Sequence, residues 1–396
     1  MYFIQIYEEK CRSGKGLKKK PEMVYDAGEA GMCSGGQKAA AGWRRKRKMK
    51  ELKLALLGFG IAGKAFSRIL LAKHDEIAKD TGYDVKVTAI TTGRSGCLID
   101  PAGIDLAAAL QEMEENRCFR PEFPGYAETD SMTVVREADY DAVLEMTPIN
   151  IKTGQPAIDH LRLAMERGKH AITANKGPIA WAYRELRDLA REKGVCFFYE
   201  TTVMAGTPIF DMAETSLAYC KISHIRGILN ATTNYFLEEM GKGLPFDTIM
   251  ENGRKGGFLE ADPSMDLDGW DASAKLTALM NVLMDADLDP MKIDRTGIMG
   301  VTTEQVLDAL GRGKKIKLLC EGYFDEEGKA VGVVKPTEIP ADDAMAGSDV
   351  VAAVRLDTDL MGPVTITQYG LETTQTGYGL FIDVVRTVRS LVGQGW

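Results

Sequence analysis

The residues of this chain that could do chemistry gather in one stretch of sixteen, Glu260–Lys275. The stretch ends on its only lysine and contains five acids, which are Glu260, Asp262, Asp266, Asp268 and Asp271. From Asp271 onward the chain lacks Gly and Pro and carries apolar side chains at helical spacing, which predicts a helix. Asp271 and Lys275 would then lie four residues apart on one helical face.

This stretch has two interpretations, and its spacing is compatible with both. A capped helix with one surface ion pair and a solvated acidic loop would contribute only a few tenths of a kcal/mol to stability. Alternatively, the acids line a pocket that holds a lysine whose proton is used in a reaction.

A glycine-rich turn near residue 60 is the second chemical signal. Leu52–Leu57 is a nearly continuous apolar run, typical of a buried parallel strand. A G-x-G-x-x-G motif follows it, then a helical pattern over 64–79 and a second strand-like run over 85–90. This order predicts a dinucleotide site in which the helix N-terminus faces the pyrophosphate, although a glycine turn without a ligand is the alternative. The expected cofactor contacts are Gly58, Phe59, Gly60, Ile61, Ala62 and Gly63.

The end of the second strand bears on which cofactor is bound. An acid usually ends this strand when it binds the ribose 2′-hydroxyl of NAD. Here no acid is present, and Arg94 and Ser95 follow instead. A cation and a hydroxyl suit a 2′-phosphate, so we expect NADP(H) to be favoured over NAD(H). An exposed structural arginine is the other interpretation.

The following segments alternate between strand and helix patterns as far as residue 199. Strands are predicted at 140–146, 169–173 and 196–199, and helices at 155–167 and 181–193. The alternation predicts an α/β fold with a Rossmann-type doubly wound parallel sheet. Thr147 and Lys176 are expected in loops after two of these strands, at the sheet edge where such folds bind ligands.

From Glu200 the pattern changes to that of a second, α+β domain. A helix is expected to about residue 219, a glycine-rich loop at 252–257 and a loop at 370–377. Further strands are predicted at 225–230, 315–324, 330–336, 350–356 and 364–369, and a last helix at 380–391. We expect a nucleotide-binding domain at 49–200, a second domain at 201–360 and a C-terminal segment at 361–396 that returns to the first domain.

Composition limits the classes of protein that this chain can belong to. No run approaches the roughly 20 apolar residues of a membrane span, and no secretory signal is recognisable. The seven scattered cysteines include no Cys-x-x-Cys, which favours reduced thiols in the cytoplasm over disulfides or zinc. The net charge of −8 divides into +7 for residues 1–48 and −15 for the rest. An acidic body argues against nucleic acid as the main ligand.

Residues 1–48 differ in composition from the rest of the chain. They are basic, glycine-rich and without hydrophobic periodicity, and a regular strand pattern begins just after Met49. We expect this segment to be a disordered or non-native extension, although a basic arm that binds nucleic acid is the alternative. A chain that begins at Met49 should keep full activity, and loss of folding in that chain would contradict the expectation.

Taken together and in order, these motifs resemble those of homoserine dehydrogenase over about residues 52–392. The motifs that carry the resemblance are Gly58–Gly63, Leu144–Pro148, Gly168–Pro178, Glu200–Pro208, Gly227–Tyr235 and Gly257–Lys275. The resemblance implies NAD(P)(H)-dependent interconversion of L-aspartate 4-semialdehyde and L-homoserine. It also implies a second domain that catalyses the reaction and forms a homodimer.

The resemblance also implies roles for particular residues. Lys275 matches the family's proton-donating lysine, and Lys176 matches its second active-site lysine. The acids that match those around the substrate are Glu260, Asp266 and Asp271. Further cofactor contacts are implied at Thr147, Lys176, Gly257 and Gly370. A sodium site formed mainly by backbone carbonyls is implied at Glu200, Val203, Ala205 and Thr207.

Two departures from the family pattern are visible. The loop near Gly370 is poorer in glycine than in many relatives, because Glu372 and Thr373 lie inside it. No regulatory ACT module or fused aspartate kinase is recognisable, so threonine feedback through such a module is not expected. Two other functions remain open, a catalytically silent NADP(H) sensor and a dehydrogenase of the same architecture that acts on another amino-acid aldehyde.

Overall fold

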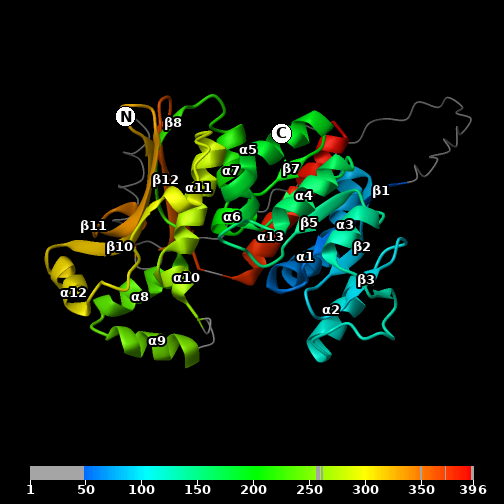
Figure 1. Cartoon of the computed structure of the whole chain (residues 1–396), viewed down its shortest axis with the longest axis horizontal. Helices are drawn as coiled ribbons and strands as arrows, with labels where there is room; N and C mark the ends of the chain where they lie inside the picture. Colours follow the sequence, from blue (N-terminus) through cyan, green and yellow to red (C-terminus); the bar gives the residue numbers. More distant parts are fainter. Residues whose placement is uncertain (1–48, 256–258, 260–261, 348–349, 371, 394–396) are drawn as a thin grey trace, which may run out of the picture. The chain divides into compact units, whose positions relative to one another are not determined.

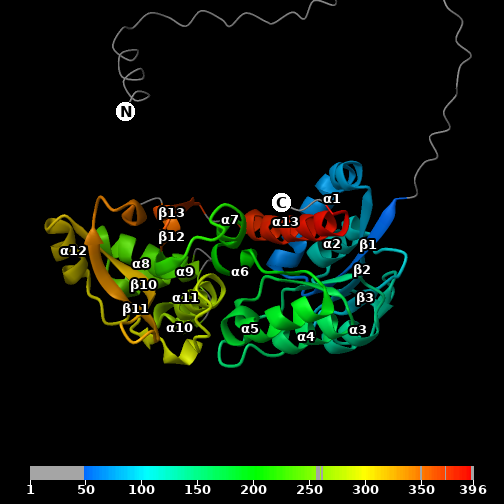
Figure 2. The ribbon, with the colours of Figure 1, turned by 90° about the horizontal axis from the view of Figure 1, so that it is seen from above.

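The computed structural model describes residues 49–255, 259, 262–347, 350–370 and 372–393. All of them lie in one compact unit that spans residues 48–396. None of the described helices is long and apolar enough to cross a membrane. Two β-sheets organise this unit (Figures 1 and 2).

The first sheet has seven strands in the order β4-β3-β2-β1-β5-β6-β7. Five neighbouring strands pair in parallel, in the order β2-β1-β5-β6-β7. At one edge, β3 and β4 add antiparallel pairs. The strands are β1 (Lys50–Leu57), β2 (Tyr83–Thr91), β3 (Cys97–Ile99), β4 (Tyr126–Ala127), β5 (Ala142–Glu145), β6 (His170–Thr173) and β7 (Phe197–Phe198). Because chain order reverses between β1 and β5, this sheet has the switch point at which doubly wound folds bind dinucleotides.

Helices cover both faces of the first sheet, and each face has its own hydrophobic cluster. One cluster packs β1, β2 and β5 against α1, α2 and the C-terminal α13, and the other packs the opposite face against α3, α4 and α5. The helices are α1 (Ile61–Thr81), α2 (Leu106–Glu115), α3 (Ser131–Glu137), α4 (Ala157–Glu166), α5 (Lys176–Lys193) and α13 (Thr373–Leu391). Strands buried on both faces explain the apolar run at the start of this domain.

The second sheet has six strands in the order β13-β12-β8-β10-β11-β9. All its pairs are antiparallel except that of β9 with β11. The strands are β8 (Ile222–Ile228), β9 (Asp294–Arg295), β10 (Lys314–Phe324), β11 (Ala330–Pro340), β12 (Val350–Thr358) and β13 (Gly362–Tyr369).

The helices of the second region pack mainly on one face of this sheet, where they enclose the largest hydrophobic cluster. They are α6 (Thr201–Met204), α7 (Ile209–Thr215), α8 (Ala231–Gly241), α9 (Phe246–Lys255), α10 (Ser264–Leu267), α11 (Trp270–Leu283) and α12 (Thr303–Gly311), with two short 3₁₀ turns, η1 (Pro290–Lys292) and η2 (Ala344–Ala346). A smaller cluster, which includes Ile228 and Leu319, lies beside η2.

The predicted fold class is confirmed, namely a Rossmann-type doubly wound sheet with an α+β region. Three local predictions were wrong. The predicted loop at 252–257 is helical as far as Lys255, because α9 continues through the glycine at 253. The predicted loop at 370–377 is helical from Thr373 onward. Lys176 is the first residue of α5 and not part of a loop, since Asn175 caps that helix by accepting a hydrogen bond from the N–H of Gly177.

The C-terminal segment divides between the two sheets. Strand β13 pairs with β12 in the second sheet, and α13 then packs against α1 beside the first sheet (Figures 1 and 2). Gly377 permits this close packing, because a Cβ atom there would lie 2.7 Å from the backbone of Ala65. The predicted boundaries at residues 200 and 360 stay predictions.

Candidate active site

Two lysines from different parts of the chain meet at one carboxylate. The Oδ1 atom of Asp271 lies 3.1 Å from Nζ of Lys176, and its Oδ2 atom lies 2.9 Å from Nζ of Lys275. Asp271 and Lys275 are one turn apart on α11, whereas Lys176 comes from the N-terminus of α5. The three side chains are only 15–19% exposed. The capped-helix interpretation, a surface ion pair beside a solvated loop, predicted neither the burial nor the second lysine.

Asp271 remains a carboxylate in this environment. Burial alone would raise its pKa, but the attraction of Lys275 and Lys176 and a hydrogen bond from Asn230 outweigh burial and hold the pKa well below its usual range. The site therefore combines one fixed negative charge with two ammonium groups.

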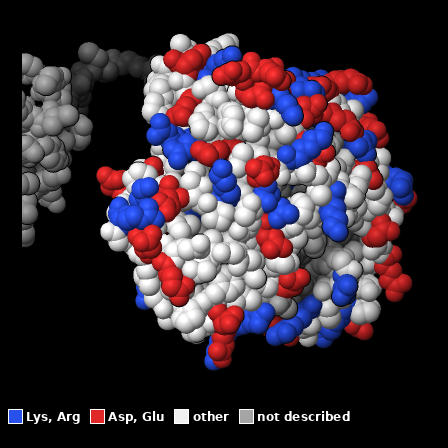
Figure 3. Space-filling model, turned by 60° about the vertical axis from the view of Figure 1, so that its left-hand side comes forward, with Lys and Arg blue, Asp and Glu red and all other residues white. Residues whose placement is uncertain are grey.

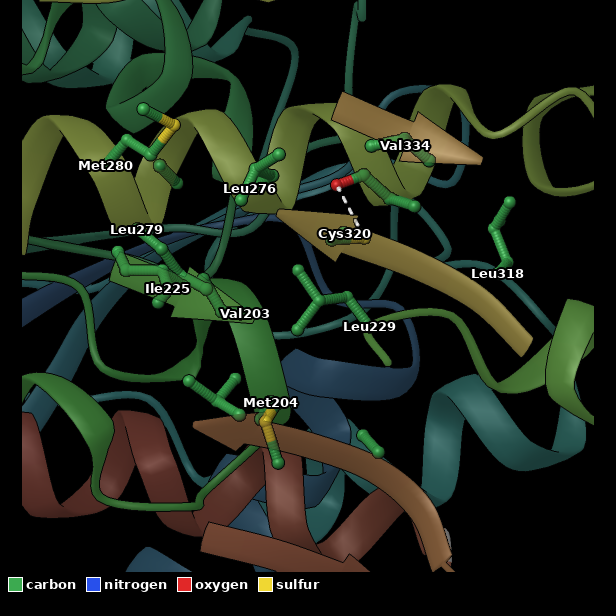
Figure 4. Packing of buried hydrophobic residues seen from close by; sticks show 14 of the residues in the cluster. Val203, Met204, Ile225, Leu229, Leu276, Leu279, Met280, Leu318, Cys320 and Val334 are labelled. Carbon is green, nitrogen blue, oxygen red and sulfur yellow. Dashed lines mark hydrogen bonds between the residues drawn. The ribbon is translucent and has the colours of Figure 1, made fainter. Parts of the chain in front are cut away.

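Lys275 has a second partner, the backbone carbonyl of Leu229, at 2.9 Å from Nζ. Leu229 is buried in the large hydrophobic cluster, which also contains Leu276 and Cys320 (Figure 4). Leu229 directly follows β8, so this hydrogen bond connects Lys275 on α11 to the end of that strand. Among the residues that the structure describes, Lys275 thus has two acceptors for its three N–H donors.

A small cavity of about 210 Å³ lies beside the two lysines. Residues from both sheet regions and from α13 form its wall. The lining is Ala174, Lys176, Thr201, Thr202, Val203, Met204, Ala205, Leu229, Ala231, Lys275, Val351, Ala352, Gln368 and Thr376. Predicted site residues from three separate motifs therefore face one space.

The glycine turn lies between β1 and α1. A Cβ atom at Gly58 would lie 2.7 Å from the carbonyl oxygen of Met146, and one at Gly63 would lie 2.5 Å from that of Gly58. A Cβ atom at Gly60 would meet no described atom within 4 Å, and Gly60, the N-cap of α1, has no side chain to cap that helix. The first and third glycines thus allow close packing, and the second leaves space at a helix N-terminus, which suits a pyrophosphate.

The remaining members of the turn differ in exposure. Phe59 is buried in the core of the first sheet, Ile61 is exposed, and Ala62 is half-buried at the start of α1. Since α1 begins at Ile61, the last three motif residues belong to the helix.

Arg94 and Ser95 lie in the turn that follows β2. Arg94 is exposed, and its side chain forms no ion pair or hydrogen bond with any residue that the structure describes. The turn is held by the Thr92 hydroxyl, which accepts a hydrogen bond from the Ser95 N–H and donates one to the Gly96 carbonyl. A fixed turn thus presents an exposed guanidinium group.

Thr147 is held in place just after β5. Its N–H donates to Oε1 of the fully buried Glu145 at 3.2 Å, and its hydroxyl contacts the same oxygen. Its carbonyl accepts a hydrogen bond of 3.1 Å from the side chain of Asn175, which also caps α5. The ends of β5 and β6 are thereby tied together next to Lys176.

The predicted sodium-site residues lie around α6. The Glu200 carboxylate is buried and accepts hydrogen bonds from the N–H groups of Ile209, Phe210 and Asp211 at 2.6–2.9 Å. Its side chain therefore caps the start of α7. Val203 and Ala205 line the cavity, Ala205 with a positive φ of 47° and a ψ of −123°, and Thr207 follows in the next turn.

The remaining predicted cofactor and substrate contacts are Gly257, Glu260, Asp266 and Gly370. Gly257 and Glu260 lie outside the described residues. Gly370 is exposed with φ 70° between β13 and α13. Asp266 is half-buried on α10, where its Oδ1 lies 2.7 Å from the side-chain nitrogen of Asn230.

Sequence reasoning assigned no role to several residues that the structure brings to this site. Asn230 contacts both Asp266 and Asp271, and Gln368 and Thr376 line the cavity. Asn230 precedes a helix and could have been identified as its N-cap. Gln368 and Thr376 carry no such signal, because long-range packing of β13 and α13 brings them to the cavity.

The doubly wound sheet, the open glycine turn at its switch point and the lysine–carboxylate site together define a nicotinamide-dependent oxidoreductase. The family model described as Homoserine dehydrogenase matches residues 208–385. The chain is 34% identical to the homoserine dehydrogenase of Methanocaldococcus jannaschii over 341 residues, which is 85% of this chain and 98% of that protein. The chain belongs to the homoserine dehydrogenase family.

Two further comparisons agree. The NAD(+)-dependent homoserine dehydrogenase of Pseudomonas canavaninivorans is 32% identical, with 86% of this chain and 97% of that protein covered. A solved structure of a hyperthermophilic archaeal homoserine dehydrogenase in complex with NADPH superimposes with a TM-score of 0.73 at 27% identity, covering 86% of this chain and 98% of that chain.

Proposed function

We propose that the chain interconverts L-aspartate 4-semialdehyde and L-homoserine with NAD(P)(H), and that Lys275 exchanges the proton with the substrate oxygen. The observation that carries this proposal is the contact of Asp271 with both Lys275 and Lys176 beside a cavity. The buried carboxylate of Asp271 holds two ammonium groups in place, and these can stabilise a substrate oxygen that becomes negatively charged during the reaction.

Lys275 is suited to act as the general acid in the reductive direction. Its ammonium group is held by the Leu229 carbonyl and by Asp271, and its third N–H is available to the substrate carbonyl oxygen. A positioned acid of this kind contributes on the order of 10²–10⁴ to the rate. In the reverse direction the neutral amine accepts the hydroxyl proton, while Lys176 places a second positive charge near the same oxygen.

The acids around the lysines suit an amino-acid substrate. Asp266 and Asp271 both contact the side chain of Asn230, so their carboxylates lie close together. An ammonium group on the substrate would compensate this negative charge. Glu260 is proposed as a third acid of this group.

The residues around the glycine turn fit a dinucleotide. The open space at Gly60, the uncapped start of α1 and the exposed Ile61 support binding of a pyrophosphate there. When bound, the nicotinamide supplies or accepts the hydride. We propose that the contacts are Gly58, Phe59, Gly60, Ile61, Ala62, Gly63, Arg94, Ser95, Thr147, Lys176, Gly257 and Gly370.

We propose that NADP(H) is favoured over NAD(H), because the exposed Arg94 at the end of β2 suits a 2′-phosphate. Arg94→Ala should raise the KM for NADPH about tenfold or more and leave the KM for NADH within about twofold. Steady-state kinetics with both cofactors measures the change. An equal effect on both cofactors, or none on NADPH, would contradict this assignment.

A sodium ion at Glu200, Val203, Ala205 and Thr207 stays a proposal. Backbone carbonyls are suitable ligands for hard cations. The positive φ of Ala205 changes the direction of the backbone at this point, which supports such a carbonyl cluster.

Assembly and location are also proposed. Strand β13 forms an edge of the second sheet, and Leu360, Met361 and Tyr369 at its ends are 63–73% exposed, which supports a homodimer. On the face shown in Figure 3, basic and acidic side chains are interspersed, which supports a small-molecule ligand rather than nucleic acid or a membrane surface. The free cysteines among the described residues support a cytoplasmic location.

One assay tests the proposed reaction. The purified chain should oxidise NADPH when supplied with L-aspartate 4-semialdehyde, with kcat/KM at least about a hundredfold above that for aldehydes that lack the α-amino group. No oxidation with any aldehyde would favour a silent cofactor sensor. A preference for another amino-acid aldehyde would favour a different substrate on the same architecture.

A further inference from the structure

Asn230 joins the acids of the candidate active site to the start of α8. It is 4% exposed and lies two residues after the end of β8, at the N-cap of α8. Its Nδ2 atom lies 2.7 Å from Oδ1 of Asp266 and 2.9 Å from Oδ2 of Asp271. Its Oδ1 atom accepts a hydrogen bond of 2.8 Å from the backbone N–H of Thr233. One buried amide thus uses both of its polar ends.

The orientation of this amide is determined by its surroundings. The Thr233 N–H can only donate, and carboxylates that have lost their protons can only accept. A flipped amide would place its oxygen against two carboxylates and its NH₂ group against an N–H. The helix N-cap therefore directs two N–H donors at the two acids.

The neighbouring residue strengthens this arrangement. The Leu229 carbonyl accepts a hydrogen bond from Lys275, so two consecutive residues at the end of β8 contact a lysine and both acids. Without the two donors of Asn230, the carboxylates of Asp266 and Asp271 would repel each other at short range. Asp271 would also lose one of the groups that fix which oxygen faces each lysine.

We propose that Asn230 is a positioning residue for the reaction: it holds Asp266 and Asp271 together as one receptor for the substrate ammonium group while it caps α8. The proposal rests on the proposed function, because it assumes that these acids bind an amino-acid substrate. It assigns to Asn230 a role in substrate affinity that an ordinary helix cap does not have.

Asn230→Ser is the primary test variant. Serine caps a helix about as well as asparagine, adds no charge, and is too short to reach both acids. We expect the KM for L-aspartate 4-semialdehyde to rise at least about tenfold, the KM for the cofactor to stay within about twofold, and the thermal midpoint to change little. A purely structural cap would not raise one KM without the other.

Thr302→Ala is the matched control. Thr302 caps α12 through a capping box with Gln305. It forms no hydrogen bond with any described residue of the candidate active site, so its loss should lower stability without disturbing Asp266 and Asp271. We expect a lower thermal midpoint and an unchanged KM for the substrate. A comparable rise of that KM in Thr302→Ala would overturn the proposal, because it would show that lower stability alone is sufficient.

Asn230→Asp provides a second, independent readout. It keeps the cap and the size of the side chain but places a third carboxyl against two others. One of three such carboxyls should hold its proton to a higher pH, so the substrate KM should become pH-dependent between about pH 5 and 8. The wild-type chain should lack this dependence.

Different results would contradict the role of Asn230 and the proposed reaction of the whole protein. A substrate KM within twofold of wild type in Asn230→Ser, or the same pH profile in Asn230→Asp as in wild type, would overturn the role of Asn230. A wild-type chain that does not reduce L-aspartate 4-semialdehyde would instead overturn the function on which the inference rests.

Discussion

At the scale of single residues, Asp271 determines how the candidate active site is arranged. Its two oxygens lie between Lys176 and Lys275, and the depressed pKa keeps it charged over the whole working range. An i,i+4 pair on an exposed helix contributes little to stability. Here the same spacing is combined with burial and a lysine from another helix, which gives the pair a role in orienting Lys275.

Replacement of this carboxylate by an amide of the same size isolates its charge. Asp271→Asn should lower kcat/KM for L-aspartate 4-semialdehyde by about 10²-fold or more. Without the carboxylate, Lys275 and Lys176 lose the partner that orients their ammonium groups. Steady-state kinetics on both proteins tests this, and near-normal kcat/KM in a folded Asp271→Asn protein would contradict it.

At the scale of elements, the glycine turn links β1 to α1, and its three glycines have different physical roles. Gly63→Ala would force a methyl group to within 2.5 Å of the Gly58 carbonyl and should destabilise the fold by about 1–3 kcal/mol. Gly60→Ala meets no protein atom, so its main effect should fall on the cofactor.

We expect Gly63→Ala mainly to lower thermal stability and Gly60→Ala mainly to weaken NADPH binding. Thermal unfolding should give a lower midpoint for Gly63→Ala than for Gly60→Ala, and titration with NADPH should give at least tenfold weaker binding for Gly60→Ala than for wild type. Unchanged NADPH affinity in a folded Gly60→Ala protein would contradict the placement of the pyrophosphate.

Much of the element order could be predicted because its signals are local. The apolar run before Gly58, the alternation of strands and helices to residue 199, and the spacing of Asp271 and Lys275 each depend on a few neighbouring residues. Errors arose where local cues conflict with packing. The glycine at 253 indicated a loop, yet α9 buries it and continues to Lys255.

The composition of the site could be predicted less fully than the fold. Lys176 and Lys275 were identified, but their shared contact with Asp271 depends on the packing of α5 against α11. Gln368 reaches the cavity because β13 pairs with β12, and Thr376 because α13 then crosses from the second sheet to α1. Such long-range contacts leave no periodic pattern in the sequence.

At the scale of the whole molecule, a buried charge cluster ties α13 to the segments that connect the two sheets. Asp383 accepts a hydrogen bond from the Glu200 N–H, and Arg386 pairs with Asp211 and Glu214. Burial raises the pKa of Asp383 to about 8, with Arg386 opposing the shift. Burial likewise raises the pKa of Glu200 to about 8, and the neighbouring Asp211 adds to this shift.

These raised pKa values predict how stability depends on pH. Between about pH 4 and 8 the folded chain holds protons that the unfolded chain releases, so the free energy of unfolding should fall as pH rises through this window. Each group contributes at most about 1.4 kcal/mol per pH unit. The stabilisation is fully present below about pH 4 and is lost above about pH 8.

The Asp383→Asn variant tests this dependence of stability on pH. The amide oxygen of its new side chain can still accept the hydrogen bond from the backbone N–H of Glu200. Thermal midpoints measured from pH 5 to 9 should fall less steeply for this variant than for wild type. Glu338→Gln is a suitable control, because hydrogen bonds from Arg312 and Lys314 lower the pKa of this exposed acid to about 2, outside the window. An identical slope in Asp383→Asn and wild type would refute the assignment.

The turnover of Lys275→Ala tests the central claim most directly, because that claim concerns one ammonium group that protonates the substrate oxygen. With saturating NADPH and L-aspartate 4-semialdehyde, kcat should fall by about 10²–10⁴-fold, while NADPH affinity and the thermal midpoint stay close to those of wild type. A folded Lys275→Ala protein that keeps kcat within about threefold of wild type would contradict the account.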